Sequence, residues 1–238
     1  FYTGVTEGNI GSARIIKMLD VLDDRLVVEA KGIYSIENFL TARRLMYWQV
    51  YLHKTSVAYE QLLVSTLLRA KELAAGGERL FAPPSLRFFL EHDTDAAAFR
   101  SDPRCLEHFV RLDDNDVWSS LKVWAGHPDK VLSTLSAGMV DRRLLKVEIA
   151  PVPFGEERKQ ALRRHIASQL GIGEKEARYF VCTADTERDM YNPSDDSIDI
   201  LYADGTTKNI AEASDMLNIA LLSKKVKKHY LCYWRTEQ

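Results

Sequence analysis

The alternation of apolar and polar residues predicts a chain that is mostly helical over residues 1–145. A periodic run, interpreted as one long helix, extends from Ser35, a plausible N-cap, to Glu72. Gly76 and Gly77 mark the end of this helix, and a strand is expected before it at residues 25–30. Other helices are expected over residues 9–22, 85–90, 102–111, 114–124 and 128–137.

The pattern changes at Lys146, where short alternating runs replace the helical periodicity. We predict an α+β fold: a mainly α-helical N-terminal part with a short β element, residues 1–145, followed by a small α+β part, residues 146–238. The second part is expected to hold a mixed sheet and two helices. Its strands are predicted over 146–149, 179–183, 198–202, 206–210 and 227–234, and its helices over 156–170 and 211–223.

Composition narrows the class of protein. A chain of 238 residues with 46% hydrophobic content can bury a proper core. The formal net charge of −2 argues against nucleic acid as a partner, because no general positive field is present. No apolar run reaches the roughly 20 residues that span a bilayer, so no membrane association is expected. Three cysteines without a CxxC pair are typical of a reducing compartment, and we expect a cytoplasmic protein.

The long predicted helix carries a candidate ligand-binding face. Arg43, Tyr47, Tyr51 and Lys54 follow one another at i, i+4, i+8 and i+11, which places two cations and two phenols along one side. Such a face suits a ligand with a polyphosphate tail and a flat or sugar-like body. The alternative is a buried helix whose long side chains reach water, and residue types alone favour that alternative.

Three residues of the sequence have the residue types of a metal site. His92 and Asp93, with His53 upstream, have the outline of a binuclear phosphohydrolase centre. However, Asp93 and Asp95 also fit a loop that caps a helix, and Lys54 beside His53 disfavours a bound cation. We therefore predict no catalytic residue and no metal ligand within this chain. Phosphate-binding glycine loops and nucleophile motifs are also missing from the sequence.

A second group of basic residues is a candidate phosphate site. Arg142 and Lys146 lie where the helical part meets the first strand of the second part. With Arg14, Lys31 and Lys54 they would form a cationic pocket for a second phosphate group. Taken alone, exposed basic residues at an element boundary are the better interpretation.

Several segments together resemble a known family. Residues 31–40, 42–51 and 52–55, extended by 112–117 and 142–146, look like the HD-domain phosphohydrolases, and most closely the deoxynucleoside triphosphate triphosphohydrolases. The resemblance covers residues 1 to about 147, and the C-terminal part resembles the appendage of the bacterial members through weaker motifs. The chain begins with Phe1-Tyr2-Thr3-Gly4, which reads like a segment from inside a longer protein.

The resemblance implies an activity and a division of roles. In that family a dNTP and water give a deoxynucleoside and triphosphate, with a divalent metal (Mg, Mn or Fe). The metal ligands precede the segment matched here, so this chain alone is expected to be inactive. Arg43 would contact the triphosphate, and Tyr51 would stack on the deoxyribose and exclude a 2′-hydroxyl. Tyr47 occupies a position held by His in the vertebrate enzyme.

The resemblance also implies regulation and assembly. Arg14, Lys31, Lys54, Arg142 and Lys146 match positions that grip regulatory nucleotides between subunits. The implied partners are nucleoside triphosphates and further copies of the chain, as a dimer or tetramer. The alternative function is a non-catalytic module for nucleotide sensing or oligomerisation.

Overall fold

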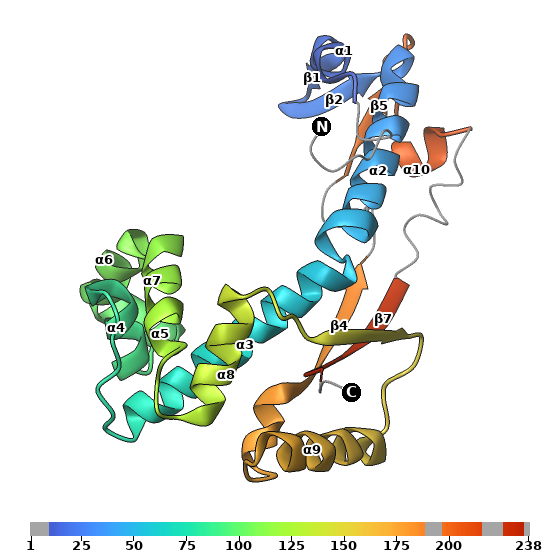
Figure 1. Cartoon of the computed structure of the whole chain (residues 1–238). Helices are drawn as coiled ribbons and strands as arrows, with labels where there is room; N and C mark the ends of the chain where they lie inside the picture. Colours follow the sequence, from blue (N-terminus) through green and yellow to red (C-terminus); the bar gives the residue numbers. More distant parts are fainter. Residues whose placement is uncertain (1–9, 189–196, 216–225, 236–238) are drawn as a thin grey trace. The chain divides into compact units, whose positions relative to one another are not determined.

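The computed structural model describes residues 10–188, 197–215 and 226–235 and divides the chain into two compact units. The first unit comprises residues 1–56 and 185–228, and the second comprises residues 57–184 and 229–238. Each unit is therefore built from segments far apart in the sequence. The predicted boundary at residue 146 is the start of a strand, whereas the boundaries between the compact units lie at residues 56/57, 184/185 and 228/229. Figure 1 shows the helices and strands coloured by residue number.

The first unit is a helix packed on a small mixed sheet. The strand order is β1-β2-β5-β6, with β2 antiparallel to β1 and parallel to β5. Its core holds Val28, Ile36, Leu40, Ile200 and Ile210. Its elements are α1 (Ser12–Lys17), β1 (Leu19–Leu22), β2 (Arg25–Glu29), η2 (Ala30–Gly32), α2 (Ile33–Met46), η3 (Tyr47–Tyr51), β5 (Asp199–Leu201), β6 (Thr207–Asn209) and α10 (Ile210–Ala213).

The prediction of a helix over residues 9–22 was wrong for the second half of this segment. α1 ends at Lys17, and residues 19–22 pair with β2 in an antiparallel hairpin. Asp23 and Asp24 adopt φ of +50° and +62°, the left-handed conformations of a tight hairpin turn. The adjacent strand satisfies the backbone groups of β1, so pairing outweighs local helical periodicity. α10 is shorter than predicted, and residues 216–223 of the predicted helix lie outside the described residues.

The prediction of a single long helix was also wrong. α2 begins at Ile33, two residues before the expected N-cap Ser35, and a π-helical turn, η3, separates it from α3 (Lys54–Ala75). The Leu52 N–H donates to the Tyr47 carbonyl at 2.7 Å, an i to i+5 bond. His53 Nδ1 accepts the Thr55 N–H at 3.2 Å, which caps the new helix. The predicted end holds, because Gly77 follows α3 at φ +89°.

The second unit combines helices with a three-stranded sheet. The strand order is β3-β7-β4, and β3 runs antiparallel to β7 with Lys146 opposite Tyr233. Trp124 is fully buried and donates its indole N–H to the Phe81 carbonyl at 2.8 Å. Besides α3 the elements are α4 (Pro84–Glu91), α5 (Ala96–Ser101), α6 (Pro103–Arg111), α7 (Asp114–Trp124), α8 (Lys130–Val140), β3 (Lys146–Ala150), α9 (Glu156–Leu170), η4 (Glu176–Phe180), β4 (Val181–Arg188) and β7 (Val226–Tyr233). The end of β4 and the beginning of β7 belong to the first unit.

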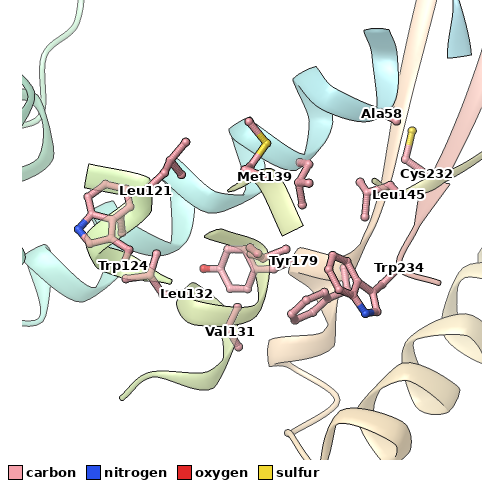
Figure 2. Packing of buried hydrophobic residues seen from close by; sticks show 14 of the residues in the cluster. Ala58, Leu121, Trp124, Val131, Leu132, Met139, Leu145, Tyr179, Cys232 and Trp234 are labelled. Carbon is pink, nitrogen blue, oxygen red and sulfur yellow. The ribbon is translucent and has the colours of Figure 1, made fainter. Parts of the chain in front are cut away.

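One apolar core joins the helices and the sheet of the second unit. Figure 2 shows Leu121 and Trp124 of α7, Leu132 of α8, Tyr179 of η4 and Trp234 after β7 in this cluster. The predicted α+β class, with a helical part followed by a small α+β part, is confirmed. Within the described residues, no helix has both the length and the apolar character needed to cross a bilayer.

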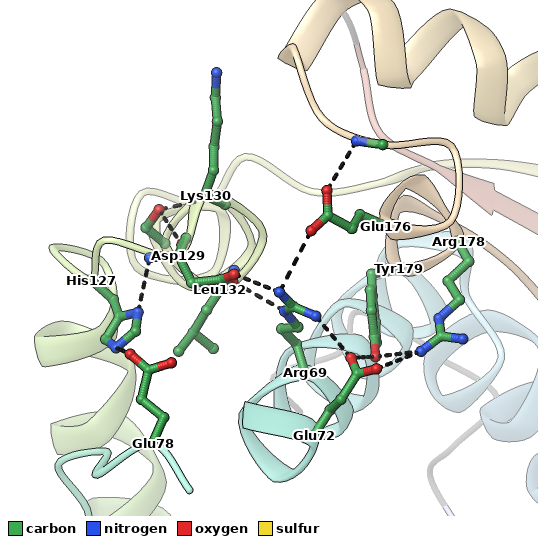
Figure 3. Close-up of polar contacts among 12 residues, drawn as sticks. Arg69, Glu72, Glu78, His127, Asp129, Lys130, Leu132, Glu176, Arg178 and Tyr179 are labelled. Carbon is green, nitrogen blue, oxygen red and sulfur yellow. Dashed lines mark hydrogen bonds and ion pairs between the residues drawn. The ribbon is translucent and has the colours of Figure 1, made fainter. Parts of the chain in front are cut away.

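A polar network crosses the same unit (Figure 3). The guanidinium of Arg69 donates to both carboxylate oxygens of Asp129, at 3.1 and 2.5 Å, and to Glu72 at 2.8 Å. The Tyr179 hydroxyl donates to Glu72, and Arg178 donates to that hydroxyl and to Glu72 at 3.0 Å each. The Tyr179 hydrogen bond is the main reason that the pKa of Glu72 lies below its ordinary value.

Candidate functional site

A pocket of about 360 Å³ in the first unit brings together three of the predicted ligand-binding residues. Arg43 comes from α2, and Tyr47 and Tyr51 are the two ends of the π-turn η3. The other lining residues have apolar side chains, and they are Ile10, Phe39, Ala42 and Met46. The structure therefore places one cation and two phenols against an apolar wall.

The geometry leaves the cation available to an anion. The Arg43 guanidinium carbon lies 5.9 Å from the centre of the Tyr47 ring, and the Tyr47 and Tyr51 rings meet edge to face at 5.4 Å. Arg43 is exposed, and among the described residues no carboxylate pairs with it. Tyr51 is 58% exposed. An exposed guanidinium with no competing carboxylate suits a phosphate ligand.

The π-turn explains why these side chains share one pocket. In an unbroken α-helix each residue advances by about 100°, so Tyr51 would lie about 80° around the axis from Arg43. A π-turn accommodates one additional residue within a wider turn, which removes part of this drift. Such turns are frequent at functional sites. The interruption that the sequence pattern missed therefore improves the alignment that the pattern predicted.

Lys54, the fourth residue of the predicted face, does not line this pocket. It is the exposed first residue of α3, beyond the break at Leu52 and His53. The prediction that Arg43 and Lys54 flank the tyrosines as two cations on one uninterrupted helix is thus wrong, because the helix ends between them. Whether Lys54 contacts a regulatory nucleotide remains a prediction.

The other predicted regulatory cations are distributed over both units. In the first unit, Lys31 forms an ion pair with Glu29 at 2.5 Å, and the Arg14 guanidinium donates to the Lys31 carbonyl at 3.5 Å. In the second unit, Arg142 lines a separate pocket, and the Lys146 ammonium lies 5.6 Å from the Tyr233 ring centre. Their role in regulation stays a prediction.

The residues weighed as a metal centre make structural contacts. His92 Nδ1 lies 2.9 Å from the Phe88 carbonyl, and its ring stacks on that of Phe88 at 4.6 Å. Asp93 pairs with Lys71 at 3.1 Å, and Asp95 accepts the Ala98 N–H at 2.8 Å. In the described part of the chain, no group of three or more His, Cys, Asp or Glu side chains converges on a metal position. These residues do not fit a metal site.

Sequence reasoning did not identify the apolar wall of the pocket. Phe39 and Met46 follow the helical spacing of Arg43 and Tyr47, so the same periodicity contained the signal. Phe39 and Ile10 also line a second pocket of about 360 Å³ in the same unit. Its other walls are largely aliphatic, and they include Ile15, Leu26, Val28, Ile36 and Ile198.

Comparison with known proteins gives one family match and several similar proteins. Residues 10–79 match the model of the HD associated region. A phosphohydrolase from Bacteroides thetaiotaomicron VPI-5482, known from a crystal structure, shares 70% sequence identity with this chain. The match has a TM-score of 0.93 and covers 99% of this chain and 58% of that one. The uncharacterized protein YwfO of Bacillus subtilis (strain 168) is 24% identical over 98% of this chain and 52% of its own length.

A hypothetical protein from Aquifex aeolicus shares the fold, with a TM-score of 0.59 and 22% identity over 98% of this chain and 50% of that one. The chain thus spans between 50% and 58% of the length of these proteins. The family match includes the π-turn and every residue of the Arg43 pocket. The chain is thus similar to an HD associated region over residues 10–79 and to a phosphohydrolase over 99% of its own length.

Proposed function

We propose that this chain supplies the phosphate and sugar contacts of an HD-type phosphohydrolase that acts on deoxynucleoside triphosphates of the dGTP type. In the proposed reaction, the oxygen of water joins the α-phosphorus and the bond from that phosphorus to O5′ breaks. O5′ takes up a proton, so that the products are a deoxynucleoside and triphosphate. The similarity to a phosphohydrolase supports the reaction class, and the substrate is our proposal.

The pocket of Arg43, Tyr47 and Tyr51 carries this proposal. The Arg43 guanidinium offers charge-assisted hydrogen bonds to a phosphate group, and no carboxylate among the described residues competes for it. The exposed ring of Tyr51 offers a flat surface for a sugar. A 2′-hydroxyl would crowd such a stacked sugar, which is the proposed basis for preferring deoxynucleotides.

A divalent metal would supply an activated water and neutralise the phosphate charge. The described residues do not fit such a site, so no step of the reaction is assigned to them. The similar proteins are longer than this chain, and we propose that the metal ligands belong to a longer protein of which this chain is a part. We expect no triphosphate release from dGTP by this chain alone with Mg²⁺, Mn²⁺ or Fe²⁺.

Binding measurements test the proposed substrate site. Isothermal titration of dGTP and GTP into the purified chain should show a preference for dGTP. Arg43→Gln should weaken dGTP binding roughly 10- to 100-fold, because one charge-assisted contact is lost. Tyr51→Ala should reduce the preference for dGTP over GTP.

Arg44→Gln is the matched control, since Arg44 is the adjacent helical arginine and does not line the pocket. It should leave dGTP affinity unchanged. Equal losses with Arg43→Gln and Arg44→Gln would reduce the effect to general electrostatics and contradict the assignment.

A further inference from the structure

Two cysteines of the second unit lie on neighbouring strands of its sheet. β4 and β7 are adjacent in the order β3-β7-β4, and Cys182 is the second residue of β4 while Cys232 is the last but one of β7. The Trp234 N–H donates to the Phe180 carbonyl at 2.9 Å. Two residues after Phe180 and two before Trp234 are the two cysteines, which pair in this way across antiparallel strands. Residues so paired have Cα atoms about 5.5 Å apart, within the range found in disulfides.

The side chains of the two cysteines are in contact. The Cys182 thiol donates to the Cys232 carbonyl oxygen, with 3.8 Å between sulfur and oxygen. The Cys232 thiol donates to the Cys182 sulfur, and the Ser65 hydroxyl of α3 is a second donor to it. These hydrogen bonds hold the pKa of Cys182 below its ordinary value although burial opposes them. The hydrogen bond to Cys182, together with burial, raises the pKa of Cys232.

The two thiols also differ in their access to solvent. Cys182 is partly exposed, whereas Cys232 is fully buried in the apolar core of the second unit (Figure 2). The thiolate is the reactive form of cysteine, so the thiol that ionises more readily and reaches solvent is the one that a dissolved oxidant attacks. A reachable cysteine beside a second, protected thiol is the arrangement of a redox-sensing cysteine and its resolving partner.

We propose that Cys182 and Cys232 form a redox-sensitive pair that a hydroperoxide converts into a reversible disulfide between β4 and β7. In the first step the Cys182 thiolate attacks one oxygen of hydrogen peroxide, the O–O bond breaks, and a sulfenic acid and hydroxide form. In the second step the Cys232 sulfur attacks the Cys182 sulfur, the S–O bond breaks, and the departing hydroxide takes up the Cys232 proton as water. The two sulfurs lose the two electrons that the peroxide gains. Thiol–disulfide exchange with a small thiol restores both thiols.

The position of the pair gives the disulfide a structural effect. Residues 185–228, which include β5, β6 and α10, belong to the first unit and lie between the two cysteines in the sequence. A cross-link that closes a long loop restricts the unfolded chain strongly, so oxidation should raise the melting temperature by roughly 5 °C or more. In a reducing compartment such a bond forms transiently, as in redox sensing.

Alkylation of the chain before and after oxidation tests the pair. The reduced protein is treated with equimolar hydrogen peroxide, unfolded, alkylated with iodoacetamide and analysed by mass spectrometry. The oxidised parent should carry one alkylated cysteine, Cys105, and a peptide that links Cys182 to Cys232, and dithiothreitol should restore alkylation of all three. This readout needs no substitution, so it does not depend on the folding of a variant.

Two variants assign the roles within the pair. Cys232→Ala should accumulate a sulfenic acid at Cys182, which dimedone traps as an adduct. Cys182→Ala should react with peroxide at Cys232 at least about 10-fold more slowly, because that thiol is buried and harder to ionise. Circular dichroism checks that both variants are folded. A dimedone adduct that forms faster at Cys232 than at Cys182 would contradict the assigned roles.

Cys105→Ala is the matched control, because Cys105 is a buried cysteine of α6 in the same unit. It should form the disulfide at the rate of the parent. Alkylation of all three cysteines in the oxidised parent, or a disulfide that involves Cys105, overturns the proposal. Disulfide formation in urea but not in buffer also overturns it, since the bond would then belong to the unfolded chain. An oxidised parent that melts no higher than the reduced one contradicts the proposed effect on the chain.

Discussion

Replacement of Asp129 should reveal how two kinds of interaction contribute to the second unit. The side chains of Asp129 and Arg69 are only 16% and 12% exposed, and two hydrogen bonds join them. Asp129 also accepts the Leu132 N–H at 2.7 Å, as the N-cap of α8. Asp129→Asn keeps an N-cap acceptor but removes the charge, whereas Asp129→Ala removes both.

The expected magnitudes follow from these contacts. Leaving a buried charge without its partner costs about 3–5 kcal/mol. Arg69 retains Glu72 at 2.8 Å, so we expect a smaller loss of unfolding free energy for Asp129→Asn, about 2–3 kcal/mol. Asp129→Ala should cost about 1 kcal/mol more, because the N-cap is lost as well.

The dependence on pH has a defined sign. Burial alone raises the pKa of Asp129, but hydrogen bonds from Arg69 and from the Leu132 N–H outweigh it, and the net pKa lies below the ordinary value. A lowered pKa in the folded state contributes stability above the unfolded pKa of about 3.9 and loses it as the pH falls through the folded value. The difference between the parent and Asp129→Asn should therefore be full at pH 7 and smaller at pH 3.

Urea unfolding followed by circular dichroism and tryptophan fluorescence measures these differences, and coincident transitions justify a two-state treatment. An Asp129→Asn protein within about 0.5 kcal/mol of the parent at pH 7 would refute the reasoning, since ordinary surface substitutions fall in that range. Equal stability of the Asp129→Asn and Asp129→Ala proteins would show that the N-cap hydrogen bond does not contribute to the free energy of unfolding.

Two further substitutions test packing and the polar network. A Cβ added at Gly138 would lie 2.8 Å from the Trp234 ring, so Gly138→Ala should cost about 1–3 kcal/mol, seen as a lower melting temperature. Tyr179→Phe removes the hydroxyl that lowers the pKa of Glu72 and should cost about 1 kcal/mol at pH 7 in urea unfolding. That cost should shrink as the pH falls through the lowered pKa, and a cost that stays constant down to pH 3 would contradict the assigned cause.

Helices with clear end signals were predictable from the sequence. The helix expected over 156–170 is α9, and the helix expected over 114–124 is α7, which begins with a capping box at Asp113. In contrast, η3 adds one residue to a helical turn and changes the apolar pattern too little for the sequence to predict the break. β1 was missed because its strand character depends on β2, which follows a two-residue turn.

The Arg43 pocket and the separate pocket that Arg142 lines differ in how much of each the sequence predicted. Arg43, Tyr47 and Tyr51 lie within nine positions of one another, so helical spacing was enough to group them. Arg143 and Arg235 are far apart in the sequence, and only the pairing of β3 with β7 brings them together. Local periodicity contains no information on such a pairing, and the left-handed backbone at Arg142 has no signal in its residue type.

The extra residue of η3 has a consequence for comparing related sequences. On a straight α-helix, a tyrosine seven positions after the arginine lies only about 20° from it, close to where the π-turn brings Tyr51. An ortholog with a one-codon deletion between the tyrosines would thus keep the same three groups in phase. An alignment gap at this point should be read as a change of helix type with the binding chemistry retained.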